Sequence, residues 1–323
     1  MLVVSEQDAR ALVSMADAIE AVAGAFAAMA RQQARNYPVV REVVGHRDAV
    51  FGVKAGCDAG MPLLGLKAGG YWPHNLGAGL GNHQSATLLF DPETGRASAL
   101  VSANYLTGVR TGAASAIATR HLARADSAVL GIIGAGAQAQ HQLRATAAVR
   151  PLRAVHAWAR CTDHVAALGR TAQELGLAFT AAAHIRDVVD AADVLVTVTP
   201  AQQPLVQAAW VRPGTHVNAM GADTRGKQEL DPRLVAAAAL FVDEAAQATT
   251  IGECQHAFAA GLISASSFRA SLGEVVAGLA PGRRSAEEIT IFDGTGVALQ
   301  DLVVAQLAVR LARERGLGSE VGY

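Results

Sequence analysis

The spacing of the hydrophobic positions changes near residue 126. Beyond that point, short apolar runs of strand length alternate with stretches whose apolar residues recur at helical spacing. Strands that alternate with helices predict a parallel sheet covered by helices on both faces, which is an α/β fold. The runs predicted as strands are residues 127–133, 153–158, 177–181, 193–199, 215–220 and 240–243. The stretches predicted as helices are residues 138–149, 162–175 and 185–191.

The first 120 residues show a different pattern. Several strand-like runs occupy residues 39–100, with Gly, Pro and Asp between them, and they predict an antiparallel sheet. The expected helices outside the alternating region are residues 5–31 (one or two helices), 107–121 with Thr107 as its N-cap, and 298–315 ended by Gly316. Because the last helix lies beyond the alternating region, we expect it to return to the first domain.

A short internal echo lies within the predicted antiparallel sheet. The sequence GVKAG at 52–56 is followed by GLKAG at 65–69, and the joining segment CDAGMPLL contains turn residues. This pattern predicts a hairpin that carries one lysine on each strand.

Composition and charge narrow the class of protein. The chain has 323 residues, of which 51% are hydrophobic, and a net charge of -1. The length suggests two domains or one large one. The near-zero charge argues against a nucleic-acid partner, and every apolar run is interrupted before it reaches the length of a membrane span. The N-terminus lacks the pattern of a signal peptide, so a cytoplasmic location is expected.

The three cysteines match neither a zinc site nor a disulfide framework, because they are few and far apart. We expect Cys57, Cys161 and Cys254 to be small buried apolar residues of a protein in a reducing compartment. The histidines show no metal-binding spacing, and a structural role is expected for His74 and His83. No metal site is expected.

A glycine-rich loop follows the first predicted strand of the alternating region. Its sequence GAGAQA at 134–139 fits G-x-G-x-x-A, in which Gly134 allows a tight turn and Gly136 lets a pyrophosphate approach the backbone. The following helix would offer free N–H groups to the phosphates. A tight turn without a ligand is the alternative, but the strand before it and the helix after it favour a dinucleotide site. The expected contacts are Gly134, Ala135, Gly136, Ala137 and Gln138.

The next predicted strand bears on the choice of cofactor. An NAD site usually has Asp or Glu at the end of this strand, but residues 155–162 read VHAWARCT and contain no carboxylate. Arg160 and Thr162 suit the 2′-phosphate of NADP, so NADP is favoured over NAD. The alternative is that Arg160 is a solvated surface residue.

Four further residues suggest the chemistry of a substrate site. Arg41, Lys67 and Arg110 are cations that could hold a carboxylate, and Asp223 could face an amine or transfer protons. Around a nicotinamide they would suit a small amino acid. Each also has an ordinary alternative, as a surface cation or a turn acid. Two charged pairs, Asp243–Glu244 and Arg283–Arg284, are expected to be loop and turn residues.

The chain resembles the ornithine cyclodeaminase/μ-crystallin family over nearly its whole length. The segments that carry the resemblance are PVVR at 38–41, GLKAGGYWPHN at 65–75, LTGVRTGAAS at 106–115, GIIGAGAQAQ at 131–140, NAMGADTRGKQELD at 218–231 and IFDGTGVALQD at 291–301. The resemblance implies a homodimer. It also implies a Rossmann domain at residues 119–296 and a substrate-binding and dimerisation domain at residues 1–118 and 297–323.

The resemblance assigns roles to individual residues. Arg41, Lys67 and Arg110 match the binders of the substrate carboxylate, and Asp223 matches the acid that handles the substrate amine. Asp223 and Lys67 are therefore the expected catalytic residues. Lys227 falls at a lysine of cyclodeaminase-like members, and residues 295–297 match the stretch that closes over the nicotinamide. Further expected cofactor contacts are Thr199, Met220, Thr295 and Gly296.

The resemblance leaves the reaction open among three possibilities. The first is NAD(P)-dependent conversion of L-ornithine to L-proline and ammonia. The second is NAD(P)H-dependent reduction of a cyclic ketimine such as Δ1-pyrroline-2-carboxylate, or a related amino-acid dehydrogenase activity. The third is a non-catalytic NADPH-dependent ligand-binding protein of μ-crystallin type. The same clamp and hydride geometry serve the first two, so the fold does not separate them.

One position departs from the cyclodeaminase pattern. The cyclodeaminases carry Glu on the strand where this chain has Lys54. Lys54 is either a fourth residue of the substrate clamp or a solvated lysine on the outer face of the sheet. The predicted preference for NADP also fits a reductase better than a cyclodeaminase that recycles its cofactor.

Overall fold

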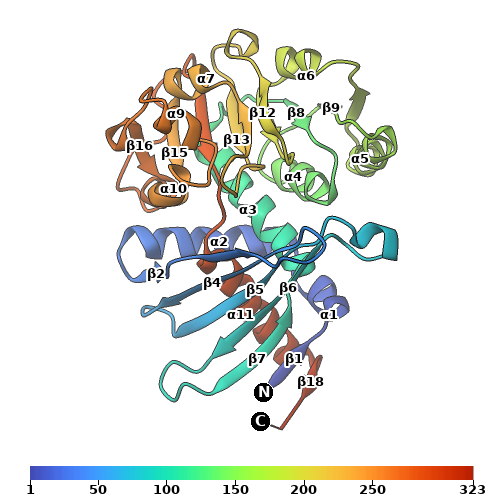
Figure 1. The fold of residues 1–323 in the computed structure, drawn as a ribbon, viewed down its shortest axis with the longest axis vertical. Coiled ribbons are helices and arrows are strands. Elements are labelled where there is room, and N and C mark those ends of the chain that lie inside the picture. Colours follow the sequence, from blue (N-terminus) through green and yellow to red (C-terminus); the bar gives the residue numbers. More distant parts are fainter. Residues whose placement is uncertain (323) are drawn as a thin grey trace. The chain divides into compact units, whose positions relative to one another are not determined.

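The computed structural model describes residues 1–322, which form two compact units (Figure 1). Unit 1 comprises residues 1–110 together with the C-terminal residues from Val297, and unit 2 comprises Thr111–Gly296. The division falls within helix α3 (Asn104–Leu122), and the boundary expected at 118/119 lies later in the same helix. Each unit is described by itself below.

Unit 1 is built on one mainly antiparallel sheet. Its strand order is β18-β1-β7-β6-β5-β4-β2, and β3 also pairs with β4. The sequence predicts this antiparallel arrangement correctly for the region between residues 39 and 100. The strands are β1 (Leu2–Val4), β2 (Ala34–Asn36), β3 (Val40–Val43), β4 (Val50–Asp58), β5 (Leu63–Tyr71), β6 (His83–Phe90), β7 (Ala97–Ser102) and β18 (Ser319–Glu320), with the short helix η1 (Asn75–Ala78) before β6.

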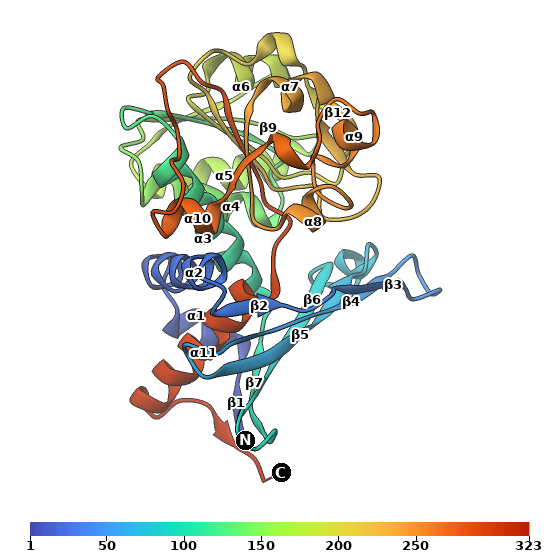
Figure 2. The ribbon, with the colours of Figure 1, turned by 90° about the vertical axis from the view of Figure 1, so that its left-hand side faces the viewer.

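Three helices of unit 1 match the predicted ones. Helices α1 (Glu6–Leu12) and α2 (Met15–Ala30) begin after Ser5 and Ser14, whose side chains accept hydrogen bonds from first-turn N–H groups. Helix α11 (Ala298–Arg315) ends at Gly316 in the left-handed conformation. It packs against α2 and on β4 and β5, so the C-terminal helix does join the first unit (Figure 2).

The two echoed segments pair with each other in register. In the β4–β5 hairpin, Lys54 lies opposite Lys67, and the glycine Gly56 lies opposite Gly65. The turn between the strands is supported by Asp58, whose carboxylate accepts hydrogen bonds from two backbone N–H groups. The predicted hairpin with one lysine on each strand is therefore confirmed.

Unit 2 contains the parallel sheet that the alternating pattern predicts. Its strand order is β10-β9-β8-β11-β13-β17-β15-β16, and all neighbouring strands are parallel. The order reverses between β8 and β11, which makes their carboxyl ends the switch point of the sheet. The strands are β8 (Val129–Ile133), β9 (Ala154–Trp158), β10 (Ala178–Ala181), β11 (Val194–Thr197), β13 (His216–Ala219), β15 (Ala239–Val242), β16 (Phe268–Ser271) and β17 (Thr290–Asp293).

Helices and a small second sheet accompany this parallel sheet. Strands β12 (Gln202–Val206) and β14 (Gln228–Leu230) form the second sheet. The helices are α4 (Ala137–Ala147), α5 (Thr162–Glu174), α6 (Ile185–Ala191), η2 (Ala208–Trp210), α7 (Pro232–Ala237), α8 (Ala245–Ala248), α9 (Gln255–Ala259), η3 (Ala265–Ser267) and α10 (Leu272–Val276).

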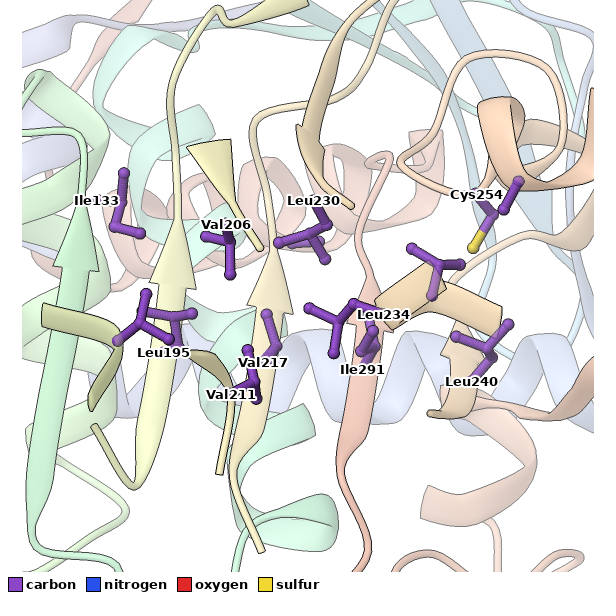
Figure 3. Close-up of a cluster of buried hydrophobic side chains, with 14 of the residues drawn as sticks. Ile133, Leu195, Val206, Val211, Val217, Leu230, Leu234, Leu240, Cys254 and Ile291 are labelled. Atoms are coloured by element: carbon purple, nitrogen blue, oxygen red, sulfur yellow. The ribbon is translucent and has the colours of Figure 1, made fainter. Parts of the chain in front are cut away.

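One core of unit 2 lies along this sheet. Ile133, Leu195, Val217 and Ile291 project from four neighbouring strands into one fully buried cluster, which Leu234 of α7 also joins (Figure 3). These apolar runs are buried because helices cover a parallel sheet on its faces. The cluster holds the strands together, and their carboxyl ends are the positions that a ligand can reach.

The structure differs from the sequence-based expectation in two local respects. Helix α3 begins at Asn104 rather than at Thr107, so Thr107 lies inside the helix and is not its N-cap. The Thr107 hydroxyl instead approaches Lys67 Nζ, at 3.5 Å. Strands β1, β2 and β18 of unit 1 and β12, β14, β16 and β17 of unit 2 were not predicted, because they are short and their burial depends on neighbours distant in sequence. The short helices α7 to α10 were not predicted either.

Within residues 1–322, no single helix is both long enough and apolar enough to cross a bilayer. Only α1 and α2 taken together reach that length and composition, and they are bent by 90° at the break between them.

Candidate functional site

Unit 1 contains a buried cluster of charges around Asp301. Lys67 on β5 contacts the Asp301 carboxylate at 2.9 Å, and the Arg110 Nε donates to it at 2.9 Å. Arg110 also donates to the side-chain oxygen of Gln300 at 2.8 Å. Lys67, Arg110 and Asp301 are 7%, 7% and 2% exposed. Two of the three predicted carboxylate binders are thus held by one acid that the sequence analysis did not assign.

Small residues allow Asp301 to reach the sheet. Helix α11 crosses the face of β4 and β5 that carries the two lysines, and a side chain at Gly65 would meet Leu302 at 3.0 Å. A side chain at Gly56 would lie 3.6 Å from Ala298. The paired glycines therefore let the first turn of α11 lie close to the sheet, where Asp301 meets Lys67.

Burial and neighbouring charges shift the protonation of this cluster. Burial is the main cause that lowers the pKa of Lys67 to about 8, and the positive charges of Arg110 and Arg41 contribute to this shift against the opposing effect of Asp301. Burial alone would raise the pKa of Asp301, but Arg110, Lys67 and Lys54 lower it overall. Asp301 is consequently an anion, and Lys67 titrates in a range where its charge can change.

Arg41 and Lys54 belong to the same face of the sheet as Lys67. Arg41 on β3 lies opposite Gly52, and Lys54 on β4 lies opposite Lys67. Residues two apart on a strand share a face, so Gly52 and Lys54 point the same way. The effect of Arg41 on the pKa of Lys67 and of Lys54 on that of Asp301 agrees with this placement.

The glycine-rich loop of unit 2 has the form that a dinucleotide site requires. Gly134 has φ +102°, and a side chain there would lie 2.6 Å from the carbonyl oxygen of Val198. Gly136 is the N-cap of α4, and a side chain there would meet nothing within 4 Å. The side-chain oxygen of Gln138 is buried without a hydrogen-bond partner in the protein. These features fit a pyrophosphate beside the loop.

A buried carboxylate joins the segments that follow β11 and β13. Glu229 accepts from the backbone N–H and the hydroxyl of Thr199, both at 2.7 Å, and from the N–H of Gly221 at 2.9 Å. Burial raises the pKa of Glu229. Met220 lies between these segments and is 8% exposed. Glu229 therefore positions two segments that carry expected cofactor contacts, although the sequence analysis did not identify it.

A second carboxylate organises the segment after β17. Asp243 accepts from the Thr295 hydroxyl at 2.7 Å and from the Gly296 N–H at 2.6 Å. Asp243 lies in the loop after β15, as expected, but it is buried. Beside it, burial raises the pKa of Asp293 to about 7, although that carboxylate accepts a hydrogen bond from the Cys254 N–H.

The predicted cofactor contacts lie along one edge of the sheet. Gly134 follows β8, Thr199 follows β11, Met220 follows β13 and Thr295 follows β17, and these four strands are neighbours. The carboxyl ends of parallel strands meet at the same edge, which is where such folds bind nucleotides. Arg160 and Thr162 follow the adjacent strand β9 and are exposed.

Asp223 and Lys227 form an ion pair in the loop between β13 and β14. Lys227 Nζ lies 2.6 Å from the Asp223 carboxylate and also donates to the carbonyl oxygen of Gly221 at 3.2 Å. The Thr224 hydroxyl donates to the same carboxylate at 3.1 Å. Both charged side chains are partly exposed, so Asp223 is a carboxylate that a ligand can reach.

Two further expectations need correction. Arg283 is not a solvated turn residue, since it is half-buried and donates to the carbonyl oxygen of Leu122 at 2.7 Å and to the Thr290 hydroxyl at 3.0 Å. Cys161 is exposed as the N-cap of α5, whereas only Cys254 is buried as expected. Among residues 1–322, no group of three or more His, Cys, Asp or Glu side chains is placed to hold a metal ion.

Two functional residues were missed for different reasons. Asp301 had a signal, because it is the one acid near the start of a helix whose other early positions are apolar or amide. Its partner Lys67 is 234 residues away, so the pairing itself was not visible. Glu229 lies in the family segment at 218–231, but the residues around it do not distinguish a buried acid from a solvated one.

Comparison with known proteins supports this description. The model of the ornithine cyclodeaminase/mu-crystallin family matches residues 1–316. The chain is 52% identical over 321 residues to the iminosuccinate reductase of Paracoccus denitrificans, with 99% of each chain covered. The crystal structure of that enzyme in complex with NAD+ has a TM-score of 0.95 at 51% identity, and the match covers 100% of this chain and 99% of that chain.

Two other solved structures are equally similar in fold. The Δ1-pyrroline-2-carboxylate reductase of Thermococcus litoralis, in complex with NADH and L-proline, has a TM-score of 0.96 at 32% identity, over 99% of this chain and 100% of that chain. An archaeal alanine dehydrogenase dimer with bound NAD has a TM-score of 0.95 at 36% identity, and the match covers 100% of this chain and 99% of that chain. The chain belongs to the ornithine cyclodeaminase/mu-crystallin family.

Proposed function

We propose that this protein is an NAD(P)H-dependent reductase that acts on the C=N bond of a small α-imino acid, with iminosuccinate as the leading substrate. The observation that carries the proposal is the buried Lys67–Asp301–Arg110 cluster on a face that also holds Arg41 and Lys54. Such a cluster binds carboxylates. The relative with 52% identity is named for the reduction of iminosuccinate, which supports the same choice.

The proposed reaction assigns a role to each group. A reduced nicotinamide, when bound, would supply the hydride for the imine carbon, and the imine nitrogen would take up a proton to give the amine. Arg110 and Lys67, oriented by Asp301, bind the α-carboxylate, and Arg41 adds a third cation. Asp223 exchanges the proton with the substrate nitrogen, and Lys227 keeps its carboxylate in place.

The charge of the cluster favours a reductase over an ornithine cyclodeaminase. Ornithine carries a positively charged side chain at neutral pH, and a cation opposite Lys54 would be repelled. The reductase alternative also agrees with the names of two relatives, an iminosuccinate reductase and a Δ1-pyrroline-2-carboxylate reductase. A purely ligand-binding role would leave the proton-exchanging Asp223 without a purpose.

The cofactor preference is a separate part of the proposal. The similar solved structures contain NAD+, NADH or NAD. In this chain, the residues after β9 lack the carboxylate that selects against a 2′-phosphate, and Arg160 is exposed there. We therefore propose that NADPH is accepted and preferred, which a comparison of kcat/KM for NADPH and NADH tests directly.

The central experiment is a set of parallel assays with the purified chain. Oxaloacetate plus ammonium with reduced cofactor, and Δ1-pyrroline-2-carboxylate with reduced cofactor, are followed by loss of cofactor absorbance, and L-ornithine with NAD+ is followed by ammonia release. We expect the oxaloacetate mixture to yield L-aspartate with consumption of one reduced cofactor for each product. D223N should lower this rate by about 100-fold or more, because a general acid is lost.

The control for D223N is E93Q, which removes an exposed carboxylate from the turn between β6 and β7. It should retain the wild-type rate, and both variants should bind NADH with unchanged affinity. Ammonia release from ornithine without net cofactor change would contradict the reductase proposal, as would a D223N variant with normal turnover.

A further inference from the structure

The register of the β4–β5 hairpin places two lysines side by side on one face. Lys54 and Lys67 are directly opposite residues of an antiparallel pair, so their Cβ atoms lie about 4.5–5.5 Å apart. Like charges in this arrangement destabilise a sheet unless an anion lies between or beside them. Asp301 supplies one such anion, and the face still keeps an excess of positive charge, which indicates a site adapted to further negative charge.

The excess of positive over negative side chains on this face indicates a ligand with more than one negative charge. The cluster formed by Arg41, Lys54, Lys67, Arg110 and Asp301 contains four cations and one carboxylate. Asp301 contacts Lys67 and Arg110 directly, and both of those cations are buried. Lys54, on the strand next to Lys67, is only half-buried, as is Arg41, so these two cations are more exposed to a ligand than Lys67 and Arg110.

Two buried polar groups at the same place add hydrogen-bonding capacity. Thr87 on β6 lies opposite Lys67 and is 1% exposed, and its hydroxyl has no hydrogen-bond partner in the structure. The side-chain nitrogen of Gln300, whose oxygen accepts from Arg110, is likewise buried without a partner. Both groups can donate to an anion. The face thus offers more donors than one α-carboxylate accepts.

We propose that Lys54 binds a second carboxylate, on the side chain of the substrate, and thereby selects imino dicarboxylates over imino monocarboxylates. This inference rests on the proposed reductase function and deepens it. Arg110 and Lys67 bind the α-carboxylate. Lys54, on the neighbouring strand β4, binds the side-chain carboxylate. Lys54 is then the residue that determines specificity, while the reaction at the C=N bond is common to both substrates.

The test compares two substrates that differ only in that carboxylate. Oxaloacetate and pyruvate each condense with ammonium to an imino acid and water. That imino acid then takes a hydride from the cofactor and a proton to give aspartate or alanine. K54Q should lower kcat/KM for the oxaloacetate mixture by about 10- to 100-fold and change that for the pyruvate mixture by less than about threefold. K54R should restore most of the preference, because it keeps the charge.

The control is R96Q, which removes one exposed positive charge from the β6–β7 turn of the same unit and should alter neither substrate. Circular dichroism and thermal unfolding of each variant separate loss of fold from loss of specificity. If K54Q is folded and its kcat/KM falls by the same factor for both substrate mixtures, Lys54 does not determine specificity.

A binding measurement separates failure of this inference from failure of the proposed function. Calorimetric titration with succinate and with butyrate, in the presence of NAD+, needs no turnover. We expect wild type to prefer succinate and K54Q to lose that preference. If wild type reduces neither imino acid but K54Q still loses the preference for succinate, the role of Lys54 is supported and the reductase proposal is contradicted. Wild type that reduces both imino acids equally and binds both acids equally overturns the inference alone.

Discussion

At the scale of single residues, Lys67 is a buried cation whose charge depends on pH. Burial lowers its pKa to about 8, so its ammonium group is protonated below that value and loses its proton as the pH rises. Asp301 contacts it, and the charges of Arg110 and Arg41 also act on it. Binding of a carboxylate needs the protonated form and should therefore weaken on the alkaline side.

This gives a prediction for succinate as a competitive inhibitor. Its inhibition constant should be nearly constant below about pH 7 and rise by about tenfold per pH unit above pH 8. K67R should bind succinate with little pH dependence over the same range, because arginine keeps its charge. A wild-type profile that stays flat to pH 10 would contradict the assignment of Lys67 to the anion site.

At the scale of elements, the contact between α11 and the β4–β5 hairpin decides where Asp301 lies. Helix α11 approaches the hairpin at Gly65. Strand β6, which pairs with β5, also lies close to this glycine. A side chain there would come within 2.7 Å of the Leu88 carbonyl oxygen and 3.0 Å of Leu302. A side chain at Gly65 would therefore disturb both the pairing of β5 with β6 and the contact between α11 and the sheet.

We accordingly expect G65A to lower the free energy of unfolding by about 1–3 kcal/mol, the usual cost of overpacking. It should also weaken succinate binding, since Asp301 moves with α11. The matched control is G24A on the surface of α2, where a side chain meets nothing within 4 Å. That variant should be stabilised by up to about 1 kcal/mol. Urea unfolding measures the free energy of unfolding of both variants. Equal stability of the two would contradict the packing argument.

At the scale of the whole molecule, the outer face of the unit 1 sheet is unusually apolar. Lys67 marks the face that α11 covers, and Leu66, Leu88 and Leu100 form a row on the opposite face. All three are only half-buried in the single chain. An antiparallel sheet with one solvated face normally carries polar residues there. A second copy of the chain would bury this row.

We therefore predict a homodimer, as the resemblance to the family implies. Light scattering of the purified chain should give about twice the mass of one chain, 33.3 kDa. L66K should shift the mass toward one chain, because burying an unpaired charge in an apolar interface is costly. The control R31Q changes an exposed residue at the C-terminal end of α2 and should leave the mass unchanged. A monomeric wild type would contradict the prediction.

Much of the architecture could be predicted from the sequence because its signals are local. The alternation of apolar runs predicted the parallel sheet of unit 2, and the G-x-G-x-x-A loop predicted a tight turn that the structure confirms at Gly134. The echoed lysine segments predicted a hairpin, and they pair in register. The caps at Ser5 and Gly316 follow from the same short-range physics. The roles of Asp223, Arg41 and Arg160 remain predictions.

Only the tertiary structure decided which charges meet. Lys67 and Asp301 are separated by 234 positions, and no local pattern connects a strand in the first quarter of the chain with the last helix. Their contact arises because α11 packs on the lysine-bearing face, where paired glycines leave room. Burial there lowers the pKa of Lys67, an effect that depends on desolvation and cannot be inferred from residue type. The sequence by itself determined the elements, the loop and the candidate residues, while the packing of the helix on the sheet determined the electrostatics of the proposed site.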